Sequence, residues 1–425
     1  MMKKLLPFLC ASALALSLTA CAGTINNSTA DTASNVTFTF TGSGVTAAGE
    51  TDTGYEIDGT ALTITSSGTY TVSGSCADGS IKVKKGTTGV TLVLDGLTLT
   101  SENTAAITCG KSSEVTILVS NGTENSLSDT EQNNDDNYPE NENAENAVIK
   151  CKDGSLVTLC GDGELTITAN GKNGIKSGAT TDEDGEASLT IRDLTLNIDA
   201  PVNDAINAEQ LLNVESGTLT IDATVPSDGT GGIVGYCGKG TITSCGNTGG
   251  IGGKPSKTGG IAGQADDCQI ADCYNTGDLV LPWGAGDNNG GIAGLTYNAT
   301  LITRCYNTGT VTVEGSQAGG ICGQLNAGAT ISSCYNAGKV GAKWNSGGIA
   351  GQSTDAEIIA CHNDGLIESQ TSGWAGAGGI CGFHKGTITA CYHIGQVTGD
   401  SAIGAIVGEH NSGNISYCYW NGDLE

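Results

Sequence analysis

The sequence predicts an all-β chain that winds into a right-handed parallel β-helix, a β-solenoid with about three strands per turn. The first observation behind this prediction is a repeat of 26–31 residues between Gly231 and Gly422. Each copy has a glycine-flanked isoleucine, a short alternating run that ends in cysteine, and a glycine four residues after the cysteine. The isoleucines are Ile233, Ile261, Ile292, Ile321, Ile349, Ile380 and Ile406. A period of this size is typical of stacked coils, none of which can bury itself alone.

The second observation is the composition. Aromatic residues make up 4% of the chain and 66 of its 425 residues are glycine, which is a poor composition for a conventional three-dimensional core. A stacked sheet needs few large side chains, because the small apolar residues of each turn pack on their copies above and below. We therefore expect order that extends along one direction.

The third observation is that the isoleucine column continues upstream of the repeats. The preceding isoleucines, at steps of 27, 31 and 26 residues, are Ile206, Ile175 and Ile149. Ile107 lies 42 residues before Ile149, and the acidic segment 129–146 accounts for the excess length. We therefore expect one continuous solenoid from which an acidic loop is extruded. The alternative of two independent domains predicts a linker near residue 228, where the sequence has only a short turn.

Five segments follow from these patterns. They are a signal peptide at 1–20, a flexible tether at 21–35, an irregular solenoid at 36–230, its acidic insert at 129–146, and regular repeats at 231–425. The tether is small, polar and without period, whereas alternation of apolar and polar residues begins at about Val36.

The N-terminus has the features of a secretory signal. Lys3 and Lys4 precede an apolar run from Leu5 to Leu18, which is too short to span a bilayer. The ending LTAC at Cys21 resembles the lipobox of bacterial lipoproteins, in which cleavage leaves a lipid-modified cysteine. That resemblance implies an extracellular protein held to the bacterial membrane by lipid on Cys21.

Within each repeat, strands are expected at the GGI-x-G stretch, at the run that ends in cysteine, and at an apolar pair such as Val311 and Val313. The glycines are expected to supply positive φ at the corners. The cysteines should form a column of buried free thiols, because stacked Cβ vectors fit a disulfide badly. No cap is visible after the last turn, so self-association at the C-terminal sheet edge is expected.

Two further columns follow from the register. Asparagines two residues after the cysteines should form a hydrogen-bonded ladder; they are Asn247, Asn275, Asn307, Asn336 and Asn363. Tyrosines directly after the cysteines should point outward, either as a stabilising stack or as a ligand platform; they are Tyr274, Tyr306, Tyr335, Tyr392 and Tyr419. His362 replaces tyrosine once in this column.

The formal net charge of −27 argues against nucleic acid as a partner and favours divalent cations. The candidate calcium ligands are carboxylates in the acidic insert and in a loop two strands later, namely Asp129, Asp135, Asp136, Glu140, Asp182 and Asp184. Calcium takes six to eight oxygen ligands, which clustered carboxylates can supply. The alternative is a solvated acidic loop, since no EF-hand spacing is present.

Two families resemble this sequence. The segments SGTYTVSGSCADGSIKV and VTLVLDGLTLTSENTAAI, the acidic insert, and the G-x-L-T-I-x-A steps resemble the clostridial-type carbohydrate-binding β-helix family over about residues 60–230. That resemblance implies calcium and binding of cellulose-like or acidic plant-type polysaccharides without catalysis. The turns at Asn173 and Asp204 depart from the family's Asp-Asp-Gly-Ile pattern. The stretches GGIVG, GGIAG, GGICG and GAIVG resemble GLUG-motif repeats of bacterial surface proteins, which indicate architecture and not activity.

The candidate sugar contacts are Asn173, Lys176 and Asp204 in the turns of the irregular part, and Trp283, Trp344 and Trp374 before GGI motifs. The tryptophans suit stacking on sugar rings, and equally suit shielding of their own turns. The expected function is calcium-assisted, non-catalytic polysaccharide binding at the cell surface. The alternatives are an adhesin or spacer that binds a protein partner, and a pectate-type lyase with a lysine or arginine base.

Overall fold

The computed structural model describes residues 34–49, 53–215, 218–222, 230–252, 256–282, 286–369, 376–400 and 402–421. All regular structure in these residues is β, and they contain no helix. Accordingly, no helix within these ranges is long and apolar enough to cross a membrane. Three predicted functional residues, Cys21, Trp283 and Trp374, lie outside the described residues.

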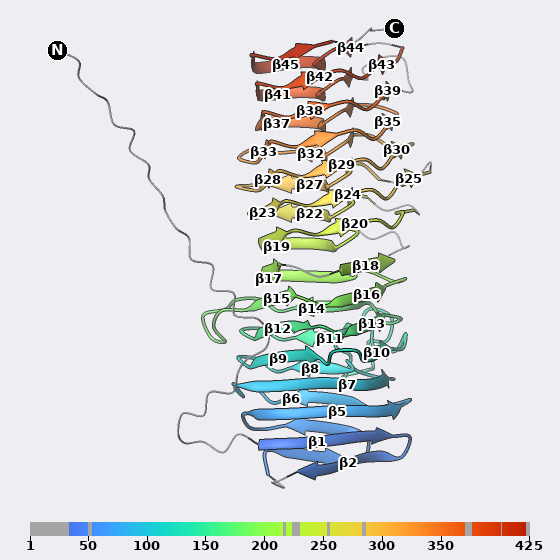
Figure 1. Cartoon of the computed structure of the whole chain (residues 1–425), viewed down its shortest axis with the longest axis vertical. Coiled ribbons are helices and arrows are strands. Elements are labelled where there is room, and N and C mark those ends of the chain that lie inside the picture. Colours follow the sequence, from blue (N-terminus) through green and yellow to red (C-terminus); the bar gives the residue numbers. More distant parts are fainter. Residues whose placement is uncertain are drawn as a thin grey trace, which may run out of the picture. The chain divides into compact units, whose positions relative to one another are not determined.

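Strands of successive turns pair in parallel and stack into a long series of coils (Figure 1). The prediction of a parallel β-solenoid is confirmed. The first column of strands consists of β4 (Ala61–Ile64), β6 (Ser80–Val83), β8 (Ile107–Cys109), β11 (Ala147–Cys151), β14 (Asn173–Ser177), β17 (Ile206–Val214), β19 (Val234–Thr243), β22 (Ala262–Asp266), β27 (Ala293–Tyr297), β32 (Cys322–Leu325), β37 (Ala350–Ile359), β41 (Cys381–Thr389) and β45 (Val407–Ser416). Ile149, Ile175 and Ile206 lie on these strands and are buried. The repeat isoleucines lie one residue before their strands, and they are buried except for the half-buried Ile406. Asn207, which follows Ile206, is opposite Tyr236, so Ile206 and Ile233 are not in register, and the prediction of one unbroken isoleucine column is wrong at this joint.

The second column begins at the N-terminal end of the described chain. Its longest strands run on into the first or the third column. It consists of β1 (Ser34–Thr41), β5 (Gly68–Cys76), β7 (Val90–Ser101), β9 (Glu114–Val119), β12 (Leu156–Gly161), β15 (Ser188–Arg192), the second halves of β17 and β19, β23 (Cys268–Ala271), β28 (Leu301–Thr303), β33 (Thr330–Ser332) and the second halves of β37, β41 and β45. The ends of β5 and β7 start a third column with β10 (Glu124–Asp129), β13 (Glu164–Thr168), β16 (Thr195–Asp199) and β18 (Thr218–Asp222).

The repeats divide each turn further than expected. The third column continues there as β20 (Gly246–Asn247), β24 (Tyr274–Asn275), β29 (Tyr306–Asn307), β34 (Tyr335–Asn336), β38 (His362–Asn363), β42 (Tyr392–His393) and β46 (Tyr419–Trp420). Two short sheets follow: β25 (Leu279–Leu281), β30 (Val311–Val313), β35 (Val340–Ala342), β39 (Ile367–Ser369) and β43 (Val397–Thr398), then β21 (Thr258–Gly259), β26 (Asn289–Gly290), β31 (Ala318–Gly319), β36 (Ser346–Gly347), β40 (Ala377–Gly378) and β44 (Ile403–Gly404). The apolar pairs of these sheets form a small second core beside the main one.

The two parts of the chain form one sheet. β17 of the irregular part pairs in parallel with β19 of the first repeat, with Asn207 opposite Tyr236 and Val214 opposite Ile242. The prediction of one continuous solenoid is therefore confirmed, and the two-domain alternative is wrong.

Antiparallel hairpins close the N-terminal end of the stack, which the sequence pattern did not reveal. β1 pairs with β2 (Gly44–Gly49), and β3 (Tyr55–Asp58) pairs with β4. The fully buried Phe38 contacts Tyr55 edge to face, with ring centroids 4.9 Å apart. Large aromatic side chains thus cover the first coil of the described chain.

The glycines of the GGI stretches are required by close packing, and the expectation of positive φ is wrong for them, whereas it holds at Gly240, Gly328, Gly386 and Gly413. A Cβ on Gly319 would lie 1.9 Å from the carbonyl oxygen of Cys322, and one on Gly320 would lie 2.3 Å from Cγ of Asn336. The left-handed corner is instead occupied by the residue before each cysteine, with φ between 51° and 56° at Ser244, Asp272, Arg304, Ser333, Ala360, Ala390 and Tyr417.

The predicted asparagine and tyrosine columns are confirmed. Each of the first four asparagines donates from Nδ2 to Oδ1 of the asparagine one turn later at 2.7–2.8 Å, whereas Nδ2 of Asn363 lies 3.0 Å from Nδ1 of His393. All five also donate to the carbonyl oxygen two residues ahead. The outward rings from Tyr274 to Tyr419, with His362 among them, stack at centroid distances of 4.7–5.4 Å. Flat rings in continuous contact form a stabilising stack, as the first alternative expects.

The cysteines follow the expectation of free thiols with one exception. The cysteines of the repeat column are free, and they are buried except for the half-buried Cys418. Cys160, by contrast, is disulfide-bonded, so the expectation is wrong at that position. At the C-terminal end of the described chain, Tyr417, Tyr419 and Trp420 are 87%, 58% and 56% exposed.

Candidate functional site

A row of lysines lies on the outer side of the first column. Lys82 on β6 is opposite Thr108 on β8, Thr108 is opposite Lys150 on β11, and Lys150 is opposite Lys176 on β14. The residue before each lysine is a buried isoleucine, so alternation along the strand points the lysines outward. We call the surface formed by Lys82, Lys150 and Lys176 the lysine face. It concentrates positive charge in a chain whose net charge is −27.

Lys150 differs from its neighbour in having no counter-charge in contact. Lys176 Nζ lies 3.2 Å from Oε1 of Glu209, whereas Lys150 makes no hydrogen bond or ion pair with the residues that the structure describes. Burial lowers the pKa of Lys150, and the positive charge of Lys176 lowers it further. A half-buried ammonium group without a partner is costly to the free protein, and an anionic ligand would relieve that cost.

Loops border both ends of the strands that carry this face. The acidic insert leads into β11, and Lys152 Nζ lies 2.5 Å from Oε1 of Glu145 at its end. The segment 178–187, which leaves β14, folds back over earlier turns, and we call it the staple loop. The lysine face is therefore a strip of sheet between two polar loops.

Asp184 fastens the staple loop. Its Oδ1 lies 3.1 Å from Lys85 Nζ and its Oδ2 lies 2.9 Å from Lys111 Nζ, while its carbonyl oxygen accepts a 2.7 Å hydrogen bond from Ser112 Oγ. The hydrogen bonds from Lys111 and then Lys85 hold the pKa of Asp184 below its ordinary value. The predicted calcium ligand is thus engaged by two cations, an arrangement that stabilises the loop and leaves little negative charge for a metal.

Asp129 is also engaged, at the base of the acidic insert. Its Oδ1 accepts hydrogen bonds from the backbone N–H groups of Asn170 and Gly171, and its Oδ2 accepts one from Asn133 Nδ2 at 2.8 Å. Burial nevertheless dominates and raises the pKa of Asp129 to about 6. Asn134 Nδ2 donates to the carbonyl oxygen of Gly171. Buried amides thus hold the base of the insert, while Asp135, Asp136 and Glu140 further along it are exposed.

The six predicted calcium ligands do not come together. Lys172 Nζ lies 2.5 Å from Oδ2 of Asp136 and 4.0 Å from Oδ1 of Asp135. Glu140 and Asp182 are exposed in separate loops. Within the described ranges, no group of three or more histidine, cysteine, aspartate or glutamate side chains is placed to hold a metal ion. The residues present therefore do not fit a calcium site of the predicted composition.

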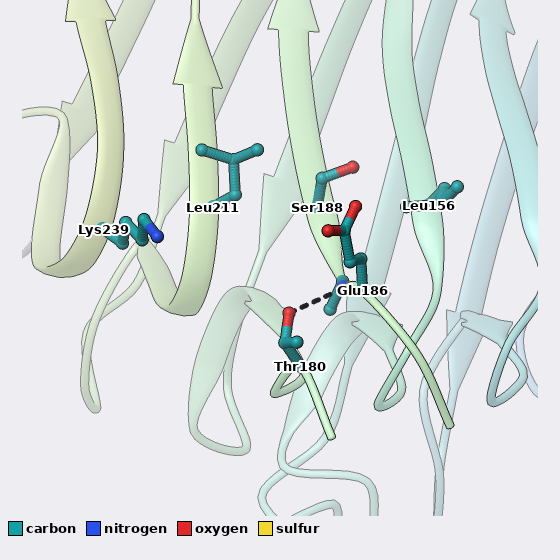
Figure 2. Close-up of a pocket in the computed structure, with 7 residues that line it drawn as sticks. Leu156, Thr180, Glu186, Ser188, Leu211 and Lys239 are labelled. Atoms are coloured by element: carbon teal, nitrogen blue, oxygen red, sulfur yellow. Dashed lines mark hydrogen bonds between the residues drawn. The ribbon is translucent and has the colours of Figure 1, made fainter. Parts of the chain in front are cut away.

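A groove lies around the corner from the lysine face (Figure 2). It encloses about 220 Å³ and is lined by Leu156, Thr180, Glu186, Ala187, Ser188, Leu211 and Lys239. Leu156, Ser188, Leu211 and Lys239 stand on successive strands in register. Thr180 Oγ1 accepts the backbone N–H of Ala187 and so shapes the staple loop where it forms one wall. Leu156 and Leu211 are 42% and 38% exposed, and they give the groove an apolar floor on either side of Ser188.

The predicted sugar contacts are divided between surface and interior. Asn173 is 1% exposed and donates to the carbonyl oxygen of Asn146, and Asp204 is 7% exposed and accepts from Asn207 Nδ2. Asn173 therefore joins two turns, whereas the bond of Asp204 to Asn207 lies within its own turn. Lys176 belongs to the lysine face. Trp344 is 43% exposed, with Lys343 Nζ 5.0 Å from its ring centroid. The structure thus leaves Lys176 and Trp344 as accessible members of the predicted set.

The sequence did not lead us to Lys82 or to the groove, and it pointed to Lys150 only as one of the lysines that could be the base of the lyase alternative. A signal for the lysines was present, because an Ile-Lys pair occurs at the same column position in three turns: Ile81-Lys82, Ile149-Lys150 and Ile175-Lys176. The groove gave no such signal, since Leu156 and Leu211 occupy outward positions where apolar residues are not expected from alternation.

Comparison with known proteins shows what the part of the chain that carries the lysine face is similar to. Residues 58–233 match the model of the "Carbohydrate-binding domain-containing protein" family. A protein of that description from Acetivibrio thermocellus is 38% identical over 117 residues, which cover 26% of this chain and 38% of the relative's length.

A solved structure of a polysaccharide lyase-like protein from C. thermocellum, a gadolinium derivative, aligns with 67% of this chain and 93% of its own, at 23% identity and a TM-score of 0.36. At that level of similarity, the alignment has no bearing on function. The family match spans the lysine face and every groove residue except Lys239. This part of the chain is therefore similar to carbohydrate-binding domains.

Proposed function

We propose that the chain binds a polysaccharide through the lysine face and the adjoining groove, and that sugars bearing carboxylates are preferred. The similarity of residues 58–233 to carbohydrate-binding domains supports the ligand class. The observation that carries the choice of surface is Lys150, which is half-buried, of lowered pKa and without an ion-pair partner among the described residues.

The geometry of the solenoid suits an extended chain of acidic sugars. Lys150 and Lys176 lie on consecutive turns, and strands of a sheet are about 4.8 Å apart. A glycan lying along the solenoid axis would therefore meet a cation at successive turns. Single exposed ion pairs contribute roughly 0.2–1 kcal/mol, so affinity on this face would depend on several lysines acting on one chain.

The groove would add apolar contact. Leu156 and Leu211 present aliphatic surface that can pack on the C–H face of a sugar ring, while Glu186 and Lys239 can bond its hydroxyl groups. Trp344, further along the solenoid, suits the same kind of stacking.

The same proposal includes where the protein is located. The LTAC motif at Cys21 supports secretion and lipid attachment, which would display the solenoid outside the cell. Metabolic labelling with a fatty acid should mark the natural chain and leave a Cys21→Ala variant unlabelled. Label retained by the variant would contradict the lipid site. Association through the exposed aromatic residues Tyr417 and Trp420 stays a prediction.

Affinity electrophoresis tests the binding proposal. Native gels would contain polygalacturonate, a neutral β-glucan, or no polysaccharide, with calcium and with a chelator in parallel. We expect retardation by polygalacturonate that weakens with salt, because the contacts are ionic. The double variant Lys150→Ala/Lys176→Ala should lose the retardation, whereas Lys339→Ala/Lys385→Ala, on exposed lysines of the repeats, should keep it. Absence of retardation in every gel would refute polysaccharide binding.

A lyase is the second candidate function, because of the same lysine. A lyase needs a base that removes the proton next to a uronate carboxyl group, and a lysine of lowered pKa suits that role. Incubation with polygalacturonate would then give unsaturated products with ultraviolet absorbance, absent from Lys150→Ala. If the absorbance does not rise, the lyase hypothesis is refuted and the binding proposal stands by itself.

A further inference from the structure

Two buried thiols on adjacent turns lie unusually close. Cys237 Sγ on β19 and Cys268 Sγ on β23 are 2.7 Å apart, and the two residues are 0% and 2% exposed. The Cys268 thiol also lies 3.1 Å from the carbonyl oxygen of Cys237. Neither residue belongs to the repeated cysteine column, and neither lies in the proposed binding surface.

Their positions in the sheet are staggered. Cys237 is opposite Ala265 of the next turn, and Cys268 is opposite Gly240 of the previous one. In the repeated column, by contrast, cysteines such as Cys273 and Cys305 stack in equivalent positions, where parallel Cβ vectors fit the disulfide dihedral poorly. A staggered pair at a corner is free of that restriction, because the two side chains approach from different residues of the turn.

We propose that Cys237 and Cys268 form a disulfide that clips the first repeat coil to the second. The reaction is thiol–disulfide exchange with a small disulfide such as oxidised glutathione. The Cys237 thiolate attacks the small disulfide and expels one glutathione thiolate. The Cys268 thiolate then attacks the mixed disulfide, forms the Cys237–Cys268 bond and expels the second. Two electrons pass from the cysteines to the small disulfide, and the two cysteine protons end on glutathione.

The bond has a mechanical consequence at the joint of the solenoid. The family-matched segment ends at residue 233, so the clip lies just beyond it, at the first turn of the repeats. It closes the chain from 237 to 268 into a covalent loop, which restricts the unfolded state and resists separation of the two coils. Because both thiols are buried, reaction is expected while the coils form or open and to be slow in the closed fold.

Peptide mapping of the full chain tests the proposal directly. The protein is refolded with oxidised and reduced glutathione, free thiols are alkylated, and the chain is cut without reduction by trypsin and a protease that cleaves before aspartate. These cuts separate Cys237, in DGTGGIVGYCGK, from Cys245, and Cys268, in DCQIA, from Cys273. We expect the two peptides joined and two hydrogens lighter than their sum. Recovery of both as alkylated peptides, or linked to other cysteines, would overturn the proposal.

Matched variants add a second readout. Oxidised natural protein should melt at a higher temperature than reduced protein, and Cys268→Ala should reduce that difference to the part that the disulfide of Cys160 contributes. Cys305→Ala, at an equally buried position of the repeated column, should keep the difference. A difference of the same size in Cys268→Ala as in the natural protein would contradict the Cys237–Cys268 disulfide. The mapping result stands whether or not a variant folds, and neither readout depends on polysaccharide binding.

Discussion

Lys150 and Lys176 face outward at the same position of consecutive turns, yet only Lys176 has a carboxylate in contact, Glu209 at 3.2 Å. The two lysines occupy equivalent positions of the sheet, but only the charge of Lys176 is balanced by a carboxylate in contact. The unpaired one is the group most sensitive to an arriving anion, and the first prediction concerns its titration.

Polysaccharide binding should weaken as pH rises through the lowered pKa of Lys150, before an ordinary lysine would lose its charge. Lysine is cationic below its pKa, so a lowered pKa means that the charge is lost at a lower pH. Affinity for polygalacturonate would be measured by calorimetry across neutral to alkaline pH. Lys150→Arg should retain affinity to higher pH, because arginine stays charged. Identical pH profiles for the two proteins would contradict this role.

Removing the Asp184 carboxylate should destabilise the staple loop. Asp184→Asn leaves Lys85 and Lys111 without their shared anion, so we expect a melting temperature lower by a few degrees and faster proteolysis within 178–187. The pKa of Asp184 is lowered in the fold, so this stabilisation is present above the unfolded pKa and is lost as pH falls through the folded one. Asp182→Asn, on an exposed neighbour, is the control and should have no effect.

Asp129 should give a pH dependence of opposite sign. Its folded pKa of about 6 exceeds the ordinary value of 3.8, so the folded state keeps a proton that the unfolded state loses. Stability from this group is therefore present at low pH and falls between about pH 4 and pH 6, by on the order of 3 kcal/mol. Urea unfolding of natural protein and Asp129→Asn at several pH values would show the difference. An equal pH dependence in both proteins would contradict the assignment.

The asparagine ladder should be most sensitive at its centre. Asn307→Ala removes the ladder partner of Nδ2 of Asn275 and of Oδ1 of Asn336, while their bonds to Gly277 and Gly338 remain, and we expect a loss of roughly 0.5–1.5 kcal/mol for each ladder bond. Asn247→Ala, at the first rung, breaks one ladder bond and should cost about half as much. Urea unfolding measures both losses. Equal losses would show that the ladder bonds do not determine the stability of this column.

The sequence was sufficient to predict the features that recur from turn to turn. The Ile, Cys, Asn and Tyr columns recur at a fixed period, so the position of one copy gives the position of the others. It also identified the insert by its length, from the 42 residues between Ile107 and Ile149.

Contacts that occur once could not be predicted in this way. The pairing of Asp184 with Lys85 joins residues 99 apart, and the burial of Asn133 beside Asp129 depends on how one loop folds. The same limit explains the error at the glycines of the GGI stretches. The sequence shows that a residue without Cβ is needed there, and only the coordinates show that a neighbouring carbonyl, and not the sign of φ, is the reason.

The affinity of Lys150→Ala/Lys176→Ala for polygalacturonate tests the central claim most directly. Titration calorimetry at low salt should show binding by the natural protein and at least about a tenfold loss in the variant, with unchanged melting temperature. The Lys339→Ala/Lys385→Ala control should bind as the natural protein does. Equal affinity in the variant and the natural protein would show that polysaccharide binds elsewhere than on the lysine face.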